Sequence, residues 1–448
     1  MIAPWTDHQV RAALGLGDGD DRPYDTVSTD TRTIVPGSLF VALRGEHHDG
    51  HDHLVGARAA GATGAVVQRG TVPLDGLTRY EVDDTLRALG DLAAYRRRAF
   101  TGPVIGITGQ NGKTSTKEMV AAVLGTRWRT HRTRANLNNL VGVPLTILEA
   151  PNDSEAWVIE AGANQPGEIA RYREIIRPDI AMVLNAGAGH LEGFGSVAGV
   201  VREKLSLTDD TPLAIVGIVP PELAAGARAR ARRVLTAGLG DTDVHPDRVN
   251  ITADGRAVVG IDDVEFALAA RGIHQAGNAM FAWAAVRELD LDRDAAAQAL
   301  EGFTLPGGRG EVMAVGDLTI VNDSYNANPQ SFVSAIALTA AMRENRRVVF
   351  VAGTMRELGP DAPALHAEVA AALVALQPDV LVLIGDFVPA IESVRAAFRG
   401  TLLTAPDAEV AGPMVAEILH GQELVVLKGS RGATLERILP FILPRMTS

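Results

Sequence analysis

The sequence has no cysteine, no long apolar run and a deficit of positive charge, and each absence excludes a class of protein. Without cysteine among 448 residues, the chain can form no disulfide, no thiolate metal site and no cysteine nucleophile. No uninterrupted apolar stretch approaches the roughly 20 residues of a membrane span, and residues 1–8 lack the charged-then-apolar order of a signal peptide. These absences predict a soluble protein of the cytoplasm.

The charge balance restricts the ligands that the chain can bind. A formal net charge of -12 at pH 7 argues against general binding of nucleic acid, because the overall field repels phosphate. An anionic ligand must therefore be held by local, pre-organised groups. With 46% hydrophobic residues the chain can bury sizeable cores, and its length predicts two to four domains.

A glycine-rich stretch near residue 110 is the strongest local signal. A short β-type run ends in Thr108-Gly109-Gln110-Asn111-Gly112-Lys113-Thr114-Ser115, and a helical pattern begins near Lys113. Consecutive N–H groups in such a turn, together with the positive end of a helix dipole, form an anion site, and the lysine adds a full charge. The longer phosphate-binding motif has a glycine where this sequence has Ile107. We expect phosphate binding here, the alternative being an ordinary strand-to-helix turn with a solvated lysine.

Apolar strands alternate with helical stretches through most of the chain, which predicts an α/β protein with largely parallel sheets. We expect central strands at 104–108, 157–160, 181–185 and 213–216, and C-terminal strands at 318–321, 348–351, 380–384 and 424–427. The Asp-Gly turn within 249–259 predicts a hairpin, and a loop at 272–278 is expected to lead into a helix at 279–289.

Turn signals divide the chain into three predicted domains. Residues 1–99 form a small α/β domain, residues 100–308 a central domain, and residues 309–448 a second doubly wound domain of Rossmann-like layout. The Gly307-Gly308 loop marks the second junction. In the first domain, Ser28, Asp30 and Arg32 are either plain turn residues or a site for a nucleotide diphosphate, because arginine matches phosphate oxygens in bidentate geometry.

Several polar residues of the central segment follow strand ends, where ligands bind in parallel sheets. Lys113, Glu160 and the residues after Asn185 lie there and can converge on one site. The Glu160 carboxylate can hold Mg²⁺ directly or through water, and the Thr114 hydroxyl can add a ligand to an ion that bridges phosphates. The sequence therefore predicts a nucleotide site with its metal at this edge of the sheet.

Two further residues are ambiguous from the sequence alone. His190 follows another strand end, but Mg²⁺ prefers oxygen and a lone histidine is more often structural, so both roles stay open. Lys204 lies on a helical run and by itself indicates one more surface charge.

Taken together, the motifs resemble those of the Mur ligases, ATP-dependent enzymes that add amino acids in peptidoglycan synthesis. The resemblance covers essentially the whole chain in order, and it rests on residues 28–32, 36–43, 49–51, 108–114, 138–146, 160–169 and 325–329. The last three stretches favour a member that adds D-alanyl-D-alanine to a UDP-N-acetylmuramoyl tripeptide. The Asp-Asn-Pro-Arg motif of the diaminopimelate-adding relative is absent.

The resemblance implies roles for individual residues. For ATP it implies Gly109, Gln110, Asn111, Gly112, Lys113, Thr114, Ser115, Asn278 at adenine, Arg309 at the phosphates and Asp323 at the ribose. For the UDP moiety it implies Ser28, Asp30, Arg32, Asp49 and His51, and for the dipeptide and domain closure Tyr325, Asn326 and Asn328. For two Mg²⁺ ions it implies Thr114, Glu160, His190 and a carbamylated Lys204, so that Lys113, Glu160, His190 and Lys204 form the catalytic set. The carbamate is chemically sensible, because an ammonium repels Mg²⁺ whereas a carbamate is an anionic oxygen ligand.

The implied reaction is the ADP-forming activation of a carboxylate as an acyl phosphate, followed by attack of an amine. Such an intermediate hydrolyses in water, so closure of the C-terminal domain is expected before the chemistry. The implied partners are small-molecule substrates only, and the chain is expected to act as a monomer.

The sequence departs from the family pattern at four positions: Leu140, Ala161, Gln275 and Thr354. These departures leave room for a paralogue that joins another amino acid or dipeptide to another carboxylate. The motifs also leave open a ligase of the folylpolyglutamate-synthase type and a nucleotide-binding protein without catalytic activity.

Overall fold

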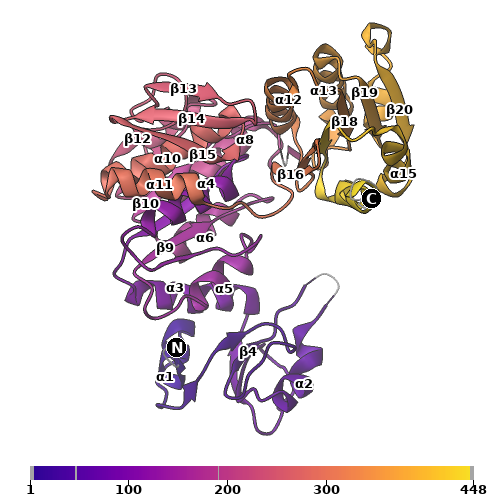
Figure 1. Ribbon diagram of the computed structural model, residues 1–448. Coiled ribbons are helices and arrows are strands. Elements are labelled where there is room, and N and C mark those ends of the chain that lie inside the picture. Colours follow the sequence, from indigo (N-terminus) through magenta and orange to yellow (C-terminus); the bar gives the residue numbers. More distant parts are fainter. Residues whose placement is uncertain (1–4, 46–47, 190, 444–448) are drawn as a thin grey trace.

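The computed structural model describes residues 5–45, 48–189 and 191–443. The chain builds three bodies in sequence order, each around its own sheet of four or more strands (Figure 1). The N-terminal sheet lies at the lower end of the molecule in Figure 1, the central sheet above it, and the C-terminal sheet at the upper right.

The N-terminal body contains a four-stranded parallel sheet in the order β3-β4-β5-β6. Its strands are β3 (Val27–Ser28), β4 (Leu39–Val41), β5 (Gly64–Gln68) and β6 (Thr78–Val82). Helix α2 (Leu54–Ala59) packs on one face through Leu54 and Ala57, against Phe40 and Val67. On the other side, helix α1 (Asp7–Leu14) and the two-stranded pair β1 (Trp5–Thr6) and β2 (Pro23–Tyr24) join the core that continues into the central body.

The central body is built on a six-stranded, fully parallel sheet in the order β12-β11-β10-β7-β9-β8. Its strands are β7 (Val104–Thr108), β8 (Thr130–Arg132), β9 (Ala156–Glu160), β10 (Ile180–Val183), β11 (Leu213–Val216) and β12 (Val234–Thr236). Because successive side chains of a strand point to opposite faces, Val104 joins one core and Ile105 the other. Both faces are therefore covered, as a parallel sheet requires.

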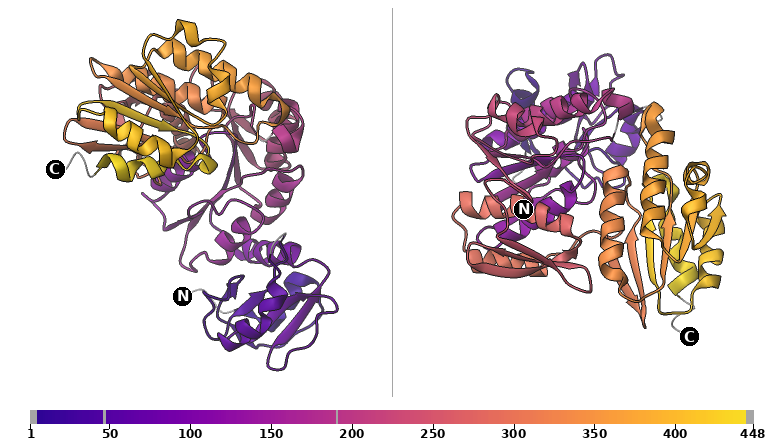
Figure 2. Two further views of the ribbon diagram at one scale, coloured as in Figure 1. Left: turned by 90° about the vertical axis from the view of Figure 1, so that its right-hand side faces the viewer. Right: turned by 90° about the horizontal axis from the view of Figure 1, so that it is seen from above.

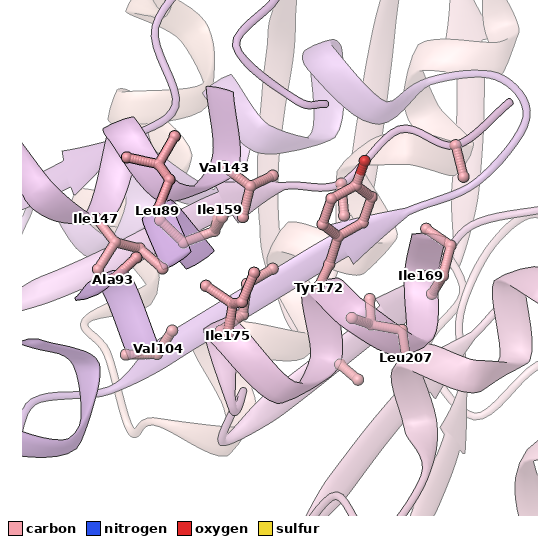
Figure 3. Close-up of a cluster of buried hydrophobic side chains, with 14 of the residues drawn as sticks. Leu89, Ala93, Val104, Val143, Ile147, Ile159, Ile169, Tyr172, Ile175 and Leu207 are labelled. Carbon is pink, nitrogen blue, oxygen red and sulfur yellow. The ribbon is translucent and has the colours of Figure 1, made fainter. Parts of the chain in front are cut away.

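Helices cover the two faces of the central sheet in two sets. One face carries α3 (Thr85–Ala99), α5 (Gly142–Leu148), α6 (Glu168–Ile176), α8 (Val197–Leu205) and α9 (Glu222–Arg228), and part of that core is drawn in Figure 3. The other face carries α4 (Lys113–Leu124), α10 (Ile273–Glu288) and α11 (Arg293–Gly302). A three-stranded antiparallel sheet of β13 (Arg248–Ile251), β14 (Arg256–Ile261) and β15 (Val264–Arg271) packs outside these helices. Helix α3 contacts α1 as well as α5 and α6, so it links the N-terminal and central bodies.

The C-terminal body is a six-stranded sheet in the order β16-β17-β21-β18-β19-β20, in which only the edge strand β16 is antiparallel. Its strands are β16 (Glu311–Val315), β17 (Leu318–Asp323), β18 (Val348–Ala352), β19 (Val380–Ile384), β20 (Thr401–Ala405) and β21 (Leu424–Lys428). Helices α12 (Pro329–Arg343), α13 (Ala362–Leu376) and α14 (Phe387–Ala390) cover one face, and α15 (Ala408–Ile418) and α16 (Leu439–Ile442) the other. Helix α12 lies on the side that faces the central body and contacts α10 (Figure 2).

The predicted α/β class and the strands at the centre of both large sheets are confirmed. The hairpin predicted at 249–259 is present as β13 and β14. The loop predicted at 272–278 is wrong, because α10 already begins at Ile273. Gly272 precedes it at a φ of 98°, and Ala276, Ala279 and Met280 are buried at helical spacing, so packing extends the helix through the expected turn. In the part of the chain that the structure describes, no helix is both long and apolar enough to cross a membrane.

A buried hydroxyl–carboxylate cluster fastens α1 to the N-terminal sheet. The Tyr80 hydroxyl donates to the Asp7 carboxylate at 2.5 Å, and the Tyr24 hydroxyl lies 2.7 Å from that of Tyr80. The backbone N–H of Asp20 and the Arg11 side chain also donate to Asp7, each at 2.9 Å. Burial by itself raises the pKa of Asp7, but the hydrogen bonds from Tyr80, Asp20 and Arg11 outweigh it and leave the pKa below its ordinary value.

We expect Tyr80→Phe to destabilise the folded chain by about 1–3 kcal/mol at pH 7, because it leaves the buried Asp7 carboxylate without its hydroxyl donor. A carboxyl whose pKa is lowered on folding contributes stability above its unfolded pKa of about 4, and this is lost as the pH falls through the folded pKa. The destabilisation measured by urea unfolding is therefore expected to shrink below about pH 4. The matched control is Tyr95→Phe, at a partly buried tyrosine outside the cluster, which is expected to change stability by less than about 0.5 kcal/mol. Equal effects of the two variants would contradict this account of the cluster.

Candidate active site

A deep cleft separates the central body from the C-terminal body. Its volume is about 810 Å³, and it opens at the carboxyl ends of β7, β9 and β17. Predicted site residues that line it are Gln110, Asn111, Gly112, Lys113, Thr114, Ser115, Glu160, Asn278, Arg309, Asp323, Tyr325, Asn326 and Asn328. The structure thus brings together groups that lie more than 200 positions apart in the sequence.

The turn between β7 and α4, residues 109–112, is called the phosphate loop below because the sequence predicts phosphate binding there. The strand ends at Thr108 and the helix begins at Lys113, with Gly112 at a φ of 82°. That left-handed conformation favours glycine, and a Cβ at this position would also overlap the side-chain oxygen of Asn278. The loop is held from the neighbouring strand end by Asn185, whose Oδ1 accepts from the backbone N–H groups of Gln110 at 3.1 Å and Asn111 at 2.8 Å. The shape of the loop is therefore held by the protein itself.

The Lys113 ammonium folds back over this loop. Its Nζ donates to the carbonyl oxygens of Gly109 at 2.9 Å and Gln110 at 3.2 Å. Burial lowers the pKa of Lys113, the negative charge of Glu160 opposes the shift, and the positive charge of Arg309 adds to it. An anion entering the cleft would relieve this repulsion between cations, which is the electrostatic condition for binding a polyphosphate.

Glu160 is the buried carboxylate at the centre of the cleft, with 1% of its surface exposed. The Thr114 hydroxyl donates to both of its oxygens at 3.0 and 3.2 Å, and the Asn138 amide donates to Oε1 at 2.8 Å. Behind it, the fully buried Lys117 ammonium lies 3.8 Å from Oε2 and donates to the carbonyl of Thr133 at 2.8 Å. Hydrogen bonds and one ion pair therefore hold this carboxylate in a fixed orientation.

Lys204 lies on α8 and is almost fully buried, beside the Phe194 ring. Burial and the nearby positive charge of Lys113 lower the pKa of Lys204 to about 7, against the opposing effect of Glu203 and Glu168. A large share of the amine is thus neutral near physiological pH, unlike that of an ordinary lysine. His190, the other residue of the predicted second metal site, lies outside the described residues.

The C-terminal wall of the cleft is a loop that follows β17. At its start, the Asp323 carboxylate pairs with the Lys428 ammonium at 2.7 Å. Further on, the Arg309 guanidinium stacks on the Tyr325 ring, 3.9 Å from its centroid. His274, from the first turn of α10, also lines the cleft; burial lowers its pKa, and the charge of Asp323 opposes this. The loop therefore lines the cleft with one carboxylate, and its Tyr325 ring holds the Arg309 guanidinium, which comes from the segment before β16.

Side-chain amides connect the two bodies directly. The Nδ2 of Asn328 donates to the Oδ1 of Asn111 at 2.6 Å, and the Asn111 Nδ2 donates to Gln330 at 3.0 Å. Asn328 is also the N-cap of α12, because its Oδ1 accepts from the backbone N–H of Ser331 at 2.9 Å. The first turn of α12 is thereby docked on the phosphate loop.

Asn278, which the resemblance assigns to adenine, lines the cleft beside the turn between β7 and α4. Its Nδ2 donates to the Oε1 of Gln275 at 3.0 Å, so the glutamine that departs from the family pattern holds the asparagine through its longer side chain. Ala161, another departure, is buried in the core. The Thr354 hydroxyl accepts from the backbone N–H of Asp386 at 3.0 Å and so connects two loops of the C-terminal body. Leu140, the fourth departure, packs partly buried against the core.

The five residues predicted for the UDP moiety do not line the cleft, and they lie in two turns of the N-terminal body. In the first, the exposed Arg32 pairs with Asp30 at 2.6–3.1 Å, which lowers the pKa of Asp30 to about 2, and the Ser28 hydroxyl donates to the Asp30 carbonyl. In the second, Asp49 accepts from the His51 Nδ1 at 2.5 Å, and the His51 Nε2 accepts from the backbone N–H of Gln68. Their role toward a substrate stays a prediction.

Several contributors to the cleft are not among the predicted site residues, among them Lys117, Asn138, Gln330 and Lys428. Asn138 belongs to a stretch that carries the resemblance, and Lys117 follows the phosphate loop by one helical turn. Lys428 and Gln330 reach the cleft only through the tertiary fold, because their partners lie far away in the sequence.

Comparison with known proteins gives the family. Family models match in order: the Mur ligase family catalytic domain at residues 23–97, the Mur ligase middle domain at 107–286, and the Mur ligase, glutamate ligase domain at 308–431. The chain is 35% identical over 437 residues to the UDP-N-acetylmuramoyl-tripeptide–D-alanyl-D-alanine ligase of Escherichia coli strain K12, with 94% of each chain covered. The same enzyme of Mycobacterium tuberculosis strain H37Rv is also 35% identical, with 88% of this chain and 85% of that one covered. The chain therefore belongs to the Mur ligase family, which confirms the resemblance seen in the motifs.

Solved structures agree over the full length. MurF from Acinetobacter baumannii matches with a TM-score of 0.89 at 28% identity, covering 99% of this chain and 100% of that one. A MurF ligase from Thermotoga maritima in complex with ADP matches with a TM-score of 0.82 at 26% identity, and the match covers 94% of this chain and 98% of that one. Folylpolyglutamate synthase from Mycobacterium tuberculosis, at 21% identity, 80% and 94% coverage and a TM-score of 0.63, shares the fold alone.

We expect Gly112→Ala to weaken ADP binding roughly 100-fold, because the new methyl group strains a left-handed position and displaces Asn278 from the loop. Isothermal titration calorimetry with ADP measures the effect. Gly302→Ala serves as the control, because its Cβ would enter open space at the end of α11, and its affinity is expected to stay within about twofold of wild type. An unchanged affinity for ADP in Gly112→Ala would show that the close packing of Gly112 against Asn278 does not matter for nucleotide binding.

Proposed function

We propose that the chain is an ADP-forming, ATP-dependent ligase that joins the amine of D-alanyl-D-alanine to the terminal carboxylate of a UDP-N-acetylmuramoyl tripeptide. The observation that carries the proposal is the cleft itself, in which a phosphate loop and a buried carboxylate lie opposite the Asp323–Asn328 loop. The relatives that bear this activity in their names match nearly the whole chain, which supports the choice of substrates.

The first half-reaction activates the carboxylate. A carboxylate oxygen of the tripeptide attacks the γ-phosphorus of ATP, the bond to the β,γ-bridging oxygen breaks, and ADP leaves. The backbone N–H groups at the start of α4 and the Lys113 ammonium bind the phosphates and neutralise the charge that develops on them. Asn278 orients the nucleotide from the wall that carries the loop, and Arg309 and Asp323 orient it from the other wall of the cleft.

The donor set at Glu160 fits Mg²⁺. A fixed carboxylate and the Thr114 hydroxyl are hard oxygen ligands, and a nucleotide-bound Mg²⁺ needs only one or two of these because phosphates and water complete its shell. When bound, the ion supplies charge neutralisation at the phosphates. A second ion would be held by His190 and Lys204.

The second half-reaction forms the amide bond. The dipeptide nitrogen attacks the acyl carbon, the tetrahedral intermediate expels phosphate, and the nitrogen loses a proton. Water competes with the amine for the acyl phosphate, so the C-terminal body must cover the site at this stage. The Asn111–Asn328 contact supports this, because it docks the predicted dipeptide loop on the phosphate loop.

The remaining assignments follow from the same reaction. Ser28, Asp30, Arg32, Asp49 and His51 would contact the UDP moiety once the N-terminal body turns toward the cleft. We place the domain boundaries after residues 99 and 308, supported by the separate sheets on either side. A monomer in the cytoplasm, serving cell-wall synthesis and so cell shape and division, agrees with substrates that are nucleotides and small peptides.

We expect Lys204 to be carbamylated by CO₂. Its neutral amine attacks the carbon of CO₂ and loses a proton, and this is favoured because the pKa of about 7 leaves a free amine at neutral pH. As the pH rises through 7, the carbamate should therefore form more readily. NMR with ¹³C-labelled CO₂ detects it directly. Lys204→Ala is expected to lose at least about 100-fold in activity and to regain part of it with added short carboxylates; unchanged activity would remove the proposal.

The reaction is tested by phosphate release and product mass. Release is expected only when ATP, the UDP-linked tripeptide and D-alanyl-D-alanine are all present, and the product must gain the mass of the dipeptide less one water. Each substrate is omitted in turn as a control. Release with a different amine or carboxylate, such as glutamate with a folate, would instead support a paralogue.

A further inference from the structure

Lysine occurs at four positions in the whole chain: Lys113, Lys117, Lys204 and Lys428. The other 38 of the 42 basic residues are arginine. Lysine is normally among the most exposed residues, yet Lys117, Lys204 and Lys428 are at most 2% exposed and Lys113 lies in the cleft. The exposed cations of this protein are thus arginines, and the lysines are confined to the interior around the cleft.

Three of the four lysines already have a role in the proposed reaction. Lys113 contacts phosphate, Lys117 supports Glu160, and Lys204 carries the carbamate. Lys428 is the one without a role, and it is the only one in the C-terminal body. Burying an ammonium costs free energy unless partners compensate, so its contacts indicate what it stabilises.

Lys428 contacts two points of the Asp323–Asn328 loop. Its Nζ pairs with the Asp323 Oδ2 at 2.7 Å and donates to the carbonyl oxygen of Asn326, also at 2.7 Å. Asp323 and Lys428 are the last residues of the adjacent parallel strands β17 and β21 and lie in register, so the sheet itself sets their approach. The ammonium also lies 6.0 Å from the centroid of the Phe332 ring on α12. One cation thus connects two strand ends, the loop and the helix that follows it.

The far end of this loop touches the phosphate loop. Asn328 caps α12 and donates to Asn111, whereas Asp323 begins the loop and faces the nucleotide side of the cleft. A change in the Asp323 carboxylate therefore reaches Asn328 through a short loop that Lys428 holds at both the start and the middle.

We propose that Lys428 is a positioning residue that holds the Asp323 carboxylate and the Asn326–Asn328 turn in one arrangement, so that nucleotide contact and docking on the phosphate loop occur together. This inference rests on the proposed function for the role of Asp323. A compact ammonium suits the position because it meets two acceptors at 2.7 Å in an enclosed space, whereas the larger, planar guanidinium of arginine would not fit the same pair.

The first test compares Lys428→Met with Arg437→Met. Arg437 lies in the same body but pairs with Glu409 on the surface, so its loss removes one positive charge without touching the cleft. We expect Lys428→Met to weaken ADP binding roughly 10- to 100-fold and to raise the KM for ATP more than it lowers kcat, while Arg437→Met stays within about twofold of wild type. Equal behaviour of the two variants would overturn the inference.

A double-mutant cycle separates positioning from general stabilisation. If Lys428 acts through Asp323, then Lys428→Met in an Asp323→Asn background is expected to cost less than about threefold in ADP affinity. Full additivity of the two losses would show that Lys428 acts independently and would overturn the proposal. Because ADP binding needs no peptide substrate, the cycle stays informative even if the chain fails to make the proposed product.

A measurement on the wild-type protein covers the case in which Lys428→Met does not fold. With lysine labelled at Cε and Nζ, the chain gives only four side-chain NMR signals, and nuclear Overhauser contacts with the Phe332 ring identify that of Lys428 in the wild-type protein. Adding ADP is expected to shift that signal, because Asp323 gains a second partner. An unchanged Lys428 signal at saturating ADP would contradict the proposal.

Discussion

The cleft places two carboxylates beside the proposed site of a polyphosphate, and the rest of the structure depends on how their charge is compensated. Glu160 and Asp323 both line it, and a phosphate chain beside them adds further negative charge. A buried lysine lies beside each carboxylate: Lys428 pairs with Asp323 at 2.7 Å, and Lys117 lies 3.8 Å from Glu160 while it pairs with Glu118 at 2.9 Å. In the proposed complex Glu160 would face a metal ion and Asp323 a ribose hydroxyl, and the hydrogen bonds and ion pairs of the two carboxylates set their orientation.

The architecture follows from this requirement. Parallel sheets align the carboxyl ends of their strands, so the loops that carry Lys113, Glu160 and Asn185 meet at one edge of the sheet. The C-terminal body repeats the principle with Asp323 and Lys428 at adjacent strand ends. The chemistry then needs only that two such edges face each other, and the hydrogen bonds that join Asn328 and Gln330 to Asn111 make that contact.

Much of this could be predicted from the sequence, and the exceptions have physical reasons. The strand Val104–Thr108 and the phosphate loop can be predicted locally. A continuous apolar run indicates the strand, and the Gly-Lys-Thr run indicates the loop, each within a few residues. The start of α10 escapes prediction because Gly277 and Asn278 indicate a turn locally, whereas packing of the helix on α4 overrides them. Lys428 and Gln330 escape it because their partners are tertiary. In the turns with Asp30 and Asp49, the carboxylates already accept local hydrogen bonds. A bound substrate would have to compete with these hydrogen bonds, and no sequence pattern predicts the outcome of that competition.

The side-chain hydrogen bonds that join the two bodies at Asn111 are made by neutral amides, and this has a consequence for how ionic strength acts on the protein. Dissolved salt screens the attraction between Lys113 and phosphate, but it has little effect on a hydrogen bond between uncharged Asn111 and Asn328 side chains. Salt is therefore expected to lower the affinity of the protein for the nucleotide and to leave the hydrogen-bonded contact between the two walls nearly unchanged. The cleft can lose its ligand to a concentrated electrolyte without losing its shape.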